Sequence, residues 1–249
     1  MTEELSGRVV LVSGGSRGIG AAICRRLAQA GATIAVNYRR SADRAAEVVA
    51  DIEAAGGRAQ AFAADVGDST QVDALVAEVR EALGPVEILV HNAGLHHSAM
   101  AHKMSDAQWH EALTVNLSAA FYLSRAVLPA MREAKSGTIV FISSASGSVA
   151  QVGAAGYTAA KHGLHGLTKA LALEGARKGI RVNAVAPGMT NTDMVAELDD
   201  EQRAGLRQRI PLGRIASPEE VAETVHFVVR HATYATGNIF HASGGVAMS

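Results

Sequence analysis

The most constraining feature of this sequence is the regular alternation of short apolar runs with longer segments of helical period. Strands that are apolar on both faces and separated by helices are typical of a parallel sheet buried between two helical layers. The order predicts an α/β protein, a Rossmann-type doubly wound parallel sheet of about seven strands joined by right-handed crossovers. The predicted strands are Val9–Ser13, Thr33–Asn37, Ala59–Ala63, Ile88–His91, Thr138–Ile142, Arg181–Val185 and Asn238–His241.

Composition agrees with a single α/β domain over residues 1–249, because 48% of the residues are hydrophobic and only 4% are aromatic. The net charge is −1 without a clustered basic excess, so we expect neither nucleic-acid nor membrane binding. The single cysteine, Cys24, cannot form an intramolecular disulfide and fits a reducing, cytoplasmic compartment. No signal peptide and no membrane span is recognisable, and we expect a soluble protein.

The C-terminal third contains one clear helix start and one long irregular stretch. Ser217, Pro218 and Glu220 form a capping box with proline at the first helical position, which predicts a helix to about Arg230. Loops longer than about 12–15 residues are usually functional or disordered. We therefore interpret the stretch at about 188–216, which carries amphipathic pieces, as a mobile substrate lid.

The first predicted strand runs directly into a glycine-rich turn, and a helical pattern opens at once. Glycines let the backbone approach a pyrophosphate, and the helix N-terminus presents free N–H groups to it. A tight turn has the same composition, but the position at the first strand-to-helix junction favours dinucleotide binding. The residues predicted to bind the cofactor here are Gly14, Ser16, Arg17, Gly18, Ile19 and Gly20.

The end of the second predicted strand favours NADP(H) over NAD(H). An acidic residue about 20 residues after the glycine turn would bind the ribose 2′-hydroxyl of NAD, whereas this chain has Asn37. The guanidinium of Arg39, with Arg17 on the other side, matches a 2′-phosphate. The alternative is that Arg39 and Arg40 are a solvated surface pair.

Further candidate residues follow the third, fourth and fifth predicted strands, at the carboxyl ends where open α/β sheets bind ligands. Asp65 and Val66 are placed to meet the adenine, although Asp65 also suits a helix cap.

Tyr157 and Lys161 lie four residues apart on a predicted helix and share one face. An adjacent cation favours the phenolate, so we expect Lys161 to lower the pKa of Tyr157. A packed tyrosine beside a lysine that extends to solvent would give the same spacing.

Together these motifs resemble the short-chain dehydrogenase/reductase family over essentially the whole chain. The glycine turn resembles the family's T-G-x-x-x-G-x-G, and Asn92-Ala93-Gly94 its N-N-A-G. Tyr157 to Lys161 matches Y-x-x-x-K, and Pro187-Gly188 the step after strand six. The resemblance implies an NADP(H)-dependent oxidoreductase that interconverts a carbonyl and a secondary alcohol.

The resemblance also implies residue roles. Ser144 would hydrogen-bond the substrate carbonyl and Tyr157 would donate the proton, while Lys161 would also bind the ribose hydroxyls. Asn116 would hold a water in the proton relay, and the Thr190 backbone would meet the nicotinamide carboxamide. The further cofactor contacts that it implies are Asn92, Ala93, Gly94, Tyr157, Lys161, Pro187 and Gly188.

Three positions depart from the family pattern. Ser13 replaces threonine but keeps the hydroxyl, and His91 replaces the first asparagine of N-N-A-G. Ser243 replaces the aspartate of a common D-G-G near the C-terminus, which questions a turn or subunit contact more than the chemistry.

Other functions fit less well. The histidines lack the spacing and acidic partners of a zinc site, so we expect no metal. The Gly-x-Ser-x-Gly elbow of a serine hydrolase is missing. A catalytically silent NADP(H) sensor remains an alternative, although such proteins usually lose the tyrosine or lysine.

Within the family, the sequence looks most like the 3-oxoacyl-[acyl-carrier-protein] reductases of fatty acid biosynthesis. Reduction of another ketone, such as acetoacetyl-CoA or a polyketide, steroid or sugar carbonyl, remains an alternative. The resemblance implies a homotetramer of D2 symmetry. It also places Lys135 and Lys178 beside the active-site mouth, where they would dock acidic acyl carrier protein, whereas the alternative is two ordinary cations at helix ends.

Overall fold

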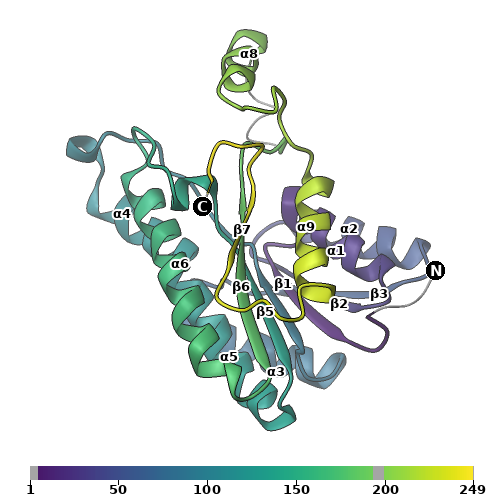
Figure 1. Cartoon of the computed structure of the whole chain (residues 1–249). Coiled ribbons are helices and arrows are strands. Elements are labelled where there is room, and N and C mark those ends of the chain that lie inside the picture. The colour runs from purple at the N-terminus through teal and green to yellow at the C-terminus, as the bar shows by residue number, and fades with distance from the viewer. Residues whose placement is uncertain (1–4, 193–198, 249) are drawn as a thin grey trace.

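A computed structural model describes residues 5–192 and 199–248, which form a seven-stranded parallel sheet of order β3-β2-β1-β4-β5-β6-β7 (Figure 1). Each predicted strand is confirmed to within one or two residues at either end. The order reverses between β1 and β4, and this switch point is where open α/β sheets bind their ligands. The strands are β1 (Val9–Ser13), β2 (Thr33–Tyr38), β3 (Arg58–Ala63), β4 (Ile88–His91), β5 (Gly137–Ile142), β6 (Ile180–Pro187) and β7 (Ile239–Ala242).

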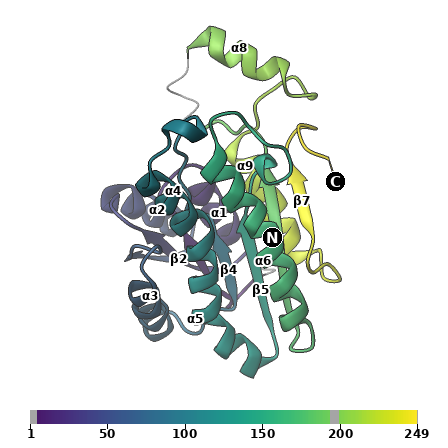
Figure 2. The ribbon, with the colours of Figure 1, turned by 90° about the vertical axis from the view of Figure 1, so that its left-hand side faces the viewer.

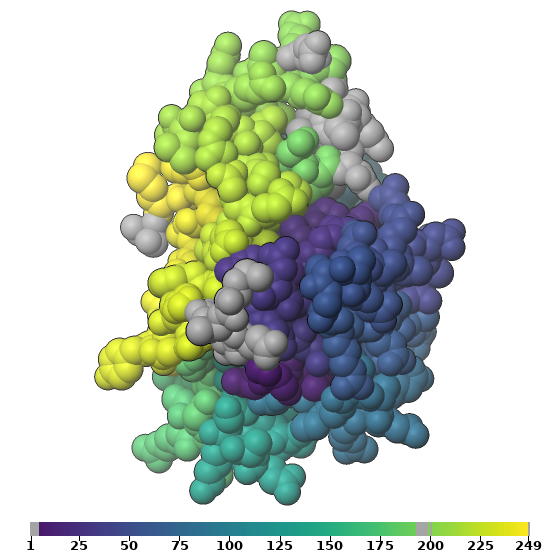
Figure 3. All heavy atoms as spheres, turned by 90° about the vertical axis from the view of Figure 1, so that its right-hand side faces the viewer, coloured from purple at the N-terminus to yellow at the C-terminus, as the bar shows by residue number. Residues whose placement is uncertain are grey.

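Helices cover both faces of the sheet (Figures 1 and 2). One layer holds α1 (Gly18–Gln29), α2 (Ala42–Ala54) and α9 (Pro218–Arg230), and the other holds α3 (Ser69–Ala82), α4 (Asp106–Leu113), α5 (Ala119–Ala134) and α6 (Ala155–Ala176). Short helical turns occur at Ala101–Lys103, Thr114–Ser118 and Ala145–Gly147. Helices α1 and α9 come from opposite ends of the chain and lie side by side, as Figure 3 shows from their outer face.

The core consists of two apolar layers, one on each face of the sheet. Successive residues of a strand point to opposite faces, so Val10 and Val12 pack under α1 and α9 whereas Val9 and Leu11 pack under α3 and α5. All four side chains are buried. This packing gives the loops at the carboxyl edge of the sheet a rigid base.

Two capping boxes define helices in the C-terminal third. The Ser217 box is confirmed, because Ser217 Oγ accepts from Glu220 N (3.3 Å) and Glu220 Oε2 accepts from Ser217 N (2.9 Å). A second box at Asp199 and Gln202 begins α8 (Asp200–Gln208), a helix inside the stretch that we expected to be irregular. Asp199 and Gln202 have the same spacing in the sequence as Ser217 and Glu220.

Helix α8 stands above the carboxyl edge of the sheet, outside the two helical layers (Figures 1 and 2). The segment that contains it is tied at its base, because Asn191 N donates to Ala216 O (2.8 Å) and Ala216 N donates to Met189 O (3.0 Å). Part of the predicted lid, 193–198, lies outside the described residues. The function of this segment as a lid stays a prediction.

Among the described helices, none combines the length and the apolar character needed to cross a membrane.

Candidate active site

The glycine turn between β1 and α1 is built so tightly that side chains are excluded. Gly14 has a φ of 63°, which favours glycine. A Cβ on Gly20 would collide with the Gly14 carbonyl, which also accepts from Asn92 Nδ2 (2.9 Å). The side chain of Arg17 does not cap α1, so the first-turn N–H groups are oriented to receive an anion.

Asn37 holds this turn to the ends of β2 and β3. Its Nδ2 donates to the carbonyls of Phe62 (3.3 Å) and Ala64 (3.2 Å), and its Oδ1 accepts from Gly14 N (3.4 Å). The side chain is buried and its amide is used by the protein. Its contribution to cofactor choice is therefore the absence of a carboxylate rather than a direct contact.

Arg39 and Asp65 lie next to each other at this end of the sheet. Their Nη1 and Oδ2 atoms are 3.4 Å apart, and Asp65 Oδ1 also accepts from Gly67 N (2.9 Å). Asp65 therefore closes a local turn, and Val66 beside it is buried. Arg17 and Arg39 are both exposed.

Ser144, Tyr157 and Lys161 meet at the carboxyl end of β5. Strand β5 ends at Ile142, and Tyr157 and Lys161 lie in the first two turns of α6. Lys161 is buried, and its Nζ donates to the Ile142 carbonyl (2.8 Å) and lies 5.5 Å from the centre of the Tyr157 ring. Burial lowers the pKa of Lys161 to about 7.

The expected lowering of the Tyr157 pKa by Lys161 stays a prediction. Burial raises the pKa of Tyr157, and the opposing influence is a hydrogen bond with Ser144. The Lys161 ammonium faces the Ile142 carbonyl and the tyrosine ring. Ser144 therefore acts on the phenol directly.

Asn116 lies in a π-helical turn, Thr114–Ser118, between α4 and α5. Its Nδ2 donates to the carbonyls of Leu95 and Ala112 (both 2.9 Å). A Cβ on Gly94 would lie 2.9 Å from Asn116 Oδ1 and 3.7 Å from Lys161 Nζ, so both groups border Gly94. π-Helical turns are frequent at functional sites.

The end of β6 closes the site beside β7. Pro187 ends the strand, and Gly188 lies so near Ser243 that a Cβ would come within 2.7 Å of the Ser243 carbonyl. Thr190 is buried and its Oγ1 donates to Gly188 O (3.2 Å). Ser243, which departs from the family pattern, closes a C-terminal turn by accepting from Ala247 N (3.2 Å) and donating to Ala247 O (3.0 Å).

Two histidines also lie at this site. The rings of His96 and Tyr157 pack edge to face with centres 5.1 Å apart. His165 Nε2 lies 2.8 Å from Ser143 Oγ, and burial lowers the pKa of His165 to about 4. His165 follows Lys161 by four residues, so the helical spacing placed it on the catalytic face.

The predicted position of Lys135 and Lys178 at the active-site mouth is wrong for a single chain. Lys135 precedes β5 and Lys178 precedes β6, so both lie at the amino edge of the sheet. Tyr157 lies at the opposite edge, because α6 has 22 residues and spans about 33 Å. The alternation of helix and strand puts the end of each helix and the end of each strand at opposite edges.

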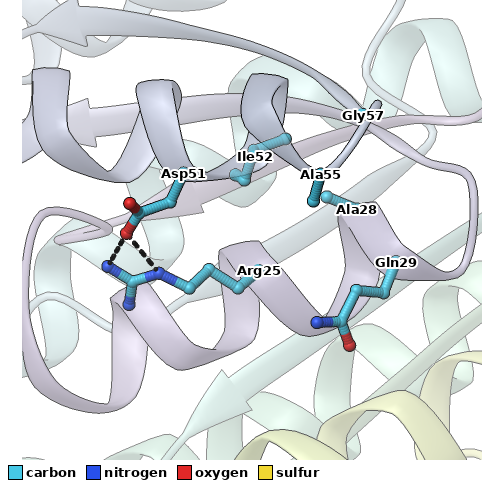
Figure 4. A pocket seen from close by; sticks show the side chains of 7 residues that line it. All are labelled: Arg25, Ala28, Gln29, Asp51, Ile52, Ala55 and Gly57. Atoms are coloured by element: carbon cyan, nitrogen blue, oxygen red, sulfur yellow. Dashed lines mark hydrogen bonds and ion pairs between the residues drawn. The ribbon is translucent and has the colours of Figure 1, made fainter.

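Two hollows lie outside the Ser144 site. Figure 4 shows a shallow one between α1 and α2, where Arg25 reaches Asp51 through hydrogen bonds of 3.0 and 2.8 Å. The other residues that line it are not ionisable, and such an exposed pair stabilises a protein by at most about 1 kcal/mol. The second, of about 530 Å³, lies between the segment that carries α8 and the end of β7, and Met189 and Ser243 line it beside Gly188.

In the described ranges, no group of three histidine, cysteine or acidic side chains is arranged to hold a metal.

The parallel sheet, the glycine turn at its switch point and the grouped Ser144, Tyr157 and Lys161 define a dinucleotide-dependent oxidoreductase. The short chain dehydrogenase family matches residues 8–203, and the chain belongs to this family. It is an oxidoreductase that acts on CH–OH or C=O groups and uses a nicotinamide cofactor.

Several named relatives cover nearly the whole chain. The 3-oxoacyl-[acyl-carrier-protein] reductase FabG of Escherichia coli (strain K12) is 39% identical over 246 residues, 98% of this chain and 99% of that protein. The 3-oxoacyl-[acyl-carrier-protein] reductase of Synechocystis sp. is 40% identical over 246 residues, 98% of each chain. The crystal structure of gox2181 superposes with a TM-score of 0.93 at 34% identity over 98% of each chain.

Proposed function

We propose that this protein is an NADPH-dependent reductase that converts a 3-oxoacyl thioester into the 3-hydroxyacyl form. The observation that carries the proposal is the convergence of Ser144, Tyr157, Lys161 and Asn116 beside the glycine turn. The names of the Escherichia coli and Synechocystis relatives support the substrate class.

The described residues fit a nicotinamide dinucleotide. The glycine turn leaves no room for side chains where a pyrophosphate would approach, and the first-turn N–H groups of α1 face the same place. When bound, the cofactor supplies the hydride. The residues that would hold it are Gly14, Ser16, Arg17, Gly18, Ile19, Gly20, Arg39, Asp65, Val66, Asn92, Ala93, Gly94, Tyr157, Lys161, Pro187, Gly188 and Thr190.

The polar side chains at the carboxyl edge orient the substrate and move its proton. Ser144 donates a hydrogen bond to the substrate carbonyl oxygen, and Tyr157 transfers its phenolic proton to that oxygen as the alcohol forms. Lys161, whose lowered pKa of about 7 lies near neutrality, is suited to pass a proton onward. Asn116 borders Lys161 across Gly94 and holds the water that links Lys161 to solvent.

Cofactor choice rests on charge at the end of β2. Asn37 leaves this place without a carboxylate, Arg39 follows it by two residues, and Arg17 lies in the glycine turn. Charge-assisted hydrogen bonds contribute about 1.5–3 kcal/mol each, so NADPH should be preferred by at least tenfold. Arg39 also contacts Asp65, so the 2′-phosphate of NADPH would compete with the Asp65 carboxylate for the Arg39 guanidinium.

The cellular setting belongs to the same proposal. The buried, free Cys24 fits the reducing cytoplasm. A homotetramer of D2 symmetry is supported by exposed apolar side chains on α5 and α6, such as Phe121 and Leu173. The substrate is a small ketone or an acyl thioester, with acyl carrier protein as a candidate carrier.

The test is a steady-state assay that follows NADPH absorbance with a carrier-linked 3-oxoacyl substrate, acetoacetyl-CoA and a simple ketone. We expect reduction of both thioesters and a kcat/KM at least tenfold higher with NADPH than with NADH. Turnover of the simple ketone alone would reject the thioester assignment. Equal kcat/KM values for the two cofactors would reject the NADPH assignment.

A further inference from the structure

A fully buried histidine, His91, lies behind the candidate active site at the end of β4. Its Nδ1 is 2.9 Å from the hydroxyl oxygen of Ser13, the last residue of the neighbouring strand β1. Ser13 is also fully buried, and the two residues face each other in the register of the sheet. Both positions depart from the family pattern, so this pair is a feature of this chain.

The hydrogen bonds of Ser13 fix the direction of this contact. Ser13 Oγ accepts from Asn92 N (3.0 Å) and from Ala93 N (3.1 Å). Both acceptor sites of the hydroxyl are thus used, so its single hydrogen is donated to His91 Nδ1. His91 must then carry its own hydrogen on Nε2.

The other edge of the His91 ring faces the π-helical turn that carries Asn116. The Val115 backbone, in this turn, opposes the lowering of the His91 pKa. Among the described residues, no partner of Nε2 meets the usual limits of hydrogen-bond geometry. Phe141 packs edge-on against the ring, with centres 6.4 Å apart. Burial, and next the Lys161 charge, lower the pKa of His91 to about 3, so the ring is neutral at physiological pH.

We propose that His91 is a positioning residue that ties the glycine turn and the Asn92–Gly94 loop, through Ser13, to the π-helical turn that holds Asn116. Ser13 lies directly before Gly14, and Asn92 Nδ2 bonds the Gly14 carbonyl, so a shift of His91 moves the surface that faces the cofactor. Val115 directly precedes Asn116, so the same shift moves Asn116 relative to Gly94 and Lys161.

Three substitutions separate the link to Ser13 from the link to the π-helical turn. His91→Asn keeps a polar atom near Nδ1, His91→Gln keeps one near Nε2, and His91→Phe keeps the ring volume without either. Val225→Ala, in the apolar core under α9, is the control for a general loss of stability. Dissociation constants for NADPH are measured by fluorescence titration, which needs no turnover, and kcat is measured separately.

One lost hydrogen bond corresponds to about a three- to tenfold effect. We expect His91→Phe to weaken NADPH binding and to lower kcat by about that factor or more each. His91→Asn should restore NADPH binding more than kcat, and His91→Gln should restore kcat more than binding. Val225→Ala should lower the melting temperature and leave both quantities unchanged.

Nitrogen-15 NMR of the histidine rings in the native protein tests the tautomer without any substitution. The expected result is a His91 ring with hydrogen on Nε2 that does not titrate between pH 5 and pH 9. A hydrogen on Nδ1, a titration in that range, or a His91→Phe variant with unchanged NADPH binding and kcat would overturn the proposal. Altered NADPH binding in a protein that reduces none of the thioesters would retain this role and reject the proposed substrate instead.

Discussion

At the residue scale, the site depends on two groups whose burial opposes their charged forms. Burial raises the pKa of Tyr157 and lowers that of Lys161 to about 7. Both shifts favour the neutral side chain, and together they separate the two pKa values, so the neutral tyrosine and the neutral lysine are the favoured pair. The protein holds these groups in place with Ser144 and the Ile142 carbonyl.

Replacing Tyr157 by phenylalanine removes the proposed proton donor and keeps the ring that packs against His96. General acid catalysis contributes typically 10²–10⁴-fold, so we expect kcat to fall by about 100-fold or more. NADPH binding should change by less than about threefold, because one weak contact is lost. A variant that retains half of the activity would show that another residue delivers the proton.

Lys161 should make the stability of the protein depend on pH. Its pKa falls from 10.5 to about 7 on folding, so between these values the unfolded chain binds more protons than the folded one. The free energy of unfolding therefore rises with pH, by about 2 kcal/mol between pH 7 and pH 9 from this residue. The free energies of unfolding of wild type and Lys161→Met are measured at both pH values by denaturation with guanidinium chloride. Parallel pH profiles of the two proteins would contradict the lowered pKa of Lys161.

The site residues were predictable from the sequence where a motif fixed both spacing and context. Tyr157 and Lys161 share a helix, and Ser144 follows a strand, so local rules placed all three. The contacts of His96 and of His91 were not predictable, because they join residues from different loops and strands. The Lys161 contact with Ile142 likewise depends on how α6 packs on β5.

At the element scale, side-chain caps begin the two C-terminal helices, α8 and α9. The contribution of each cap to the free energy of unfolding should depend on how its helix is packed. Helix α9 packs on α1 and on the sheet, whereas α8 stands outside both helical layers. Ser217→Ala should lower the free energy of unfolding by about 1 kcal/mol. Asp199→Ala removes the same kind of cap from α8 and should change global unfolding by less than about 0.5 kcal/mol. Equal losses in chemical denaturation would show that α8 is part of the cooperative core.

Strands were easier to predict than helix boundaries and irregular turns. The runs of β-branched residues identify buried parallel strands, because no other element needs apolar side chains on both faces. The π-helical turn at Thr114–Ser118 gave no signal, since its sequence continues the helical pattern on either side. The tertiary contacts of Asn116 with Leu95 and Ala112 stabilise it.

At the scale of the whole molecule, the position of Lys135 and Lys178 links carrier docking to assembly. In one chain they lie about 30 Å from Tyr157, so a carrier bound there would serve the active site of a neighbouring subunit. Lys135→Glu with Lys178→Glu should lower kcat/KM for a carrier-linked substrate about tenfold and leave a small free analogue unchanged. The defect should weaken at high salt. Equal effects on both substrates, or none, would reject docking at these lysines.

The fate of the hydride tests the central claim, a direct reduction at the Ser144, Tyr157 and Lys161 site, most directly. The protein is supplied with a 3-oxoacyl thioester and NADPH that carries deuterium at both C4 positions of the nicotinamide, and the product is analysed by mass spectrometry. We predict a 3-hydroxyacyl product with one deuterium on the new carbinol carbon, formed by wild type and almost absent with Tyr157→Phe. A hydroxyacyl product without deuterium, or equal deuterium transfer by Tyr157→Phe, would contradict the account.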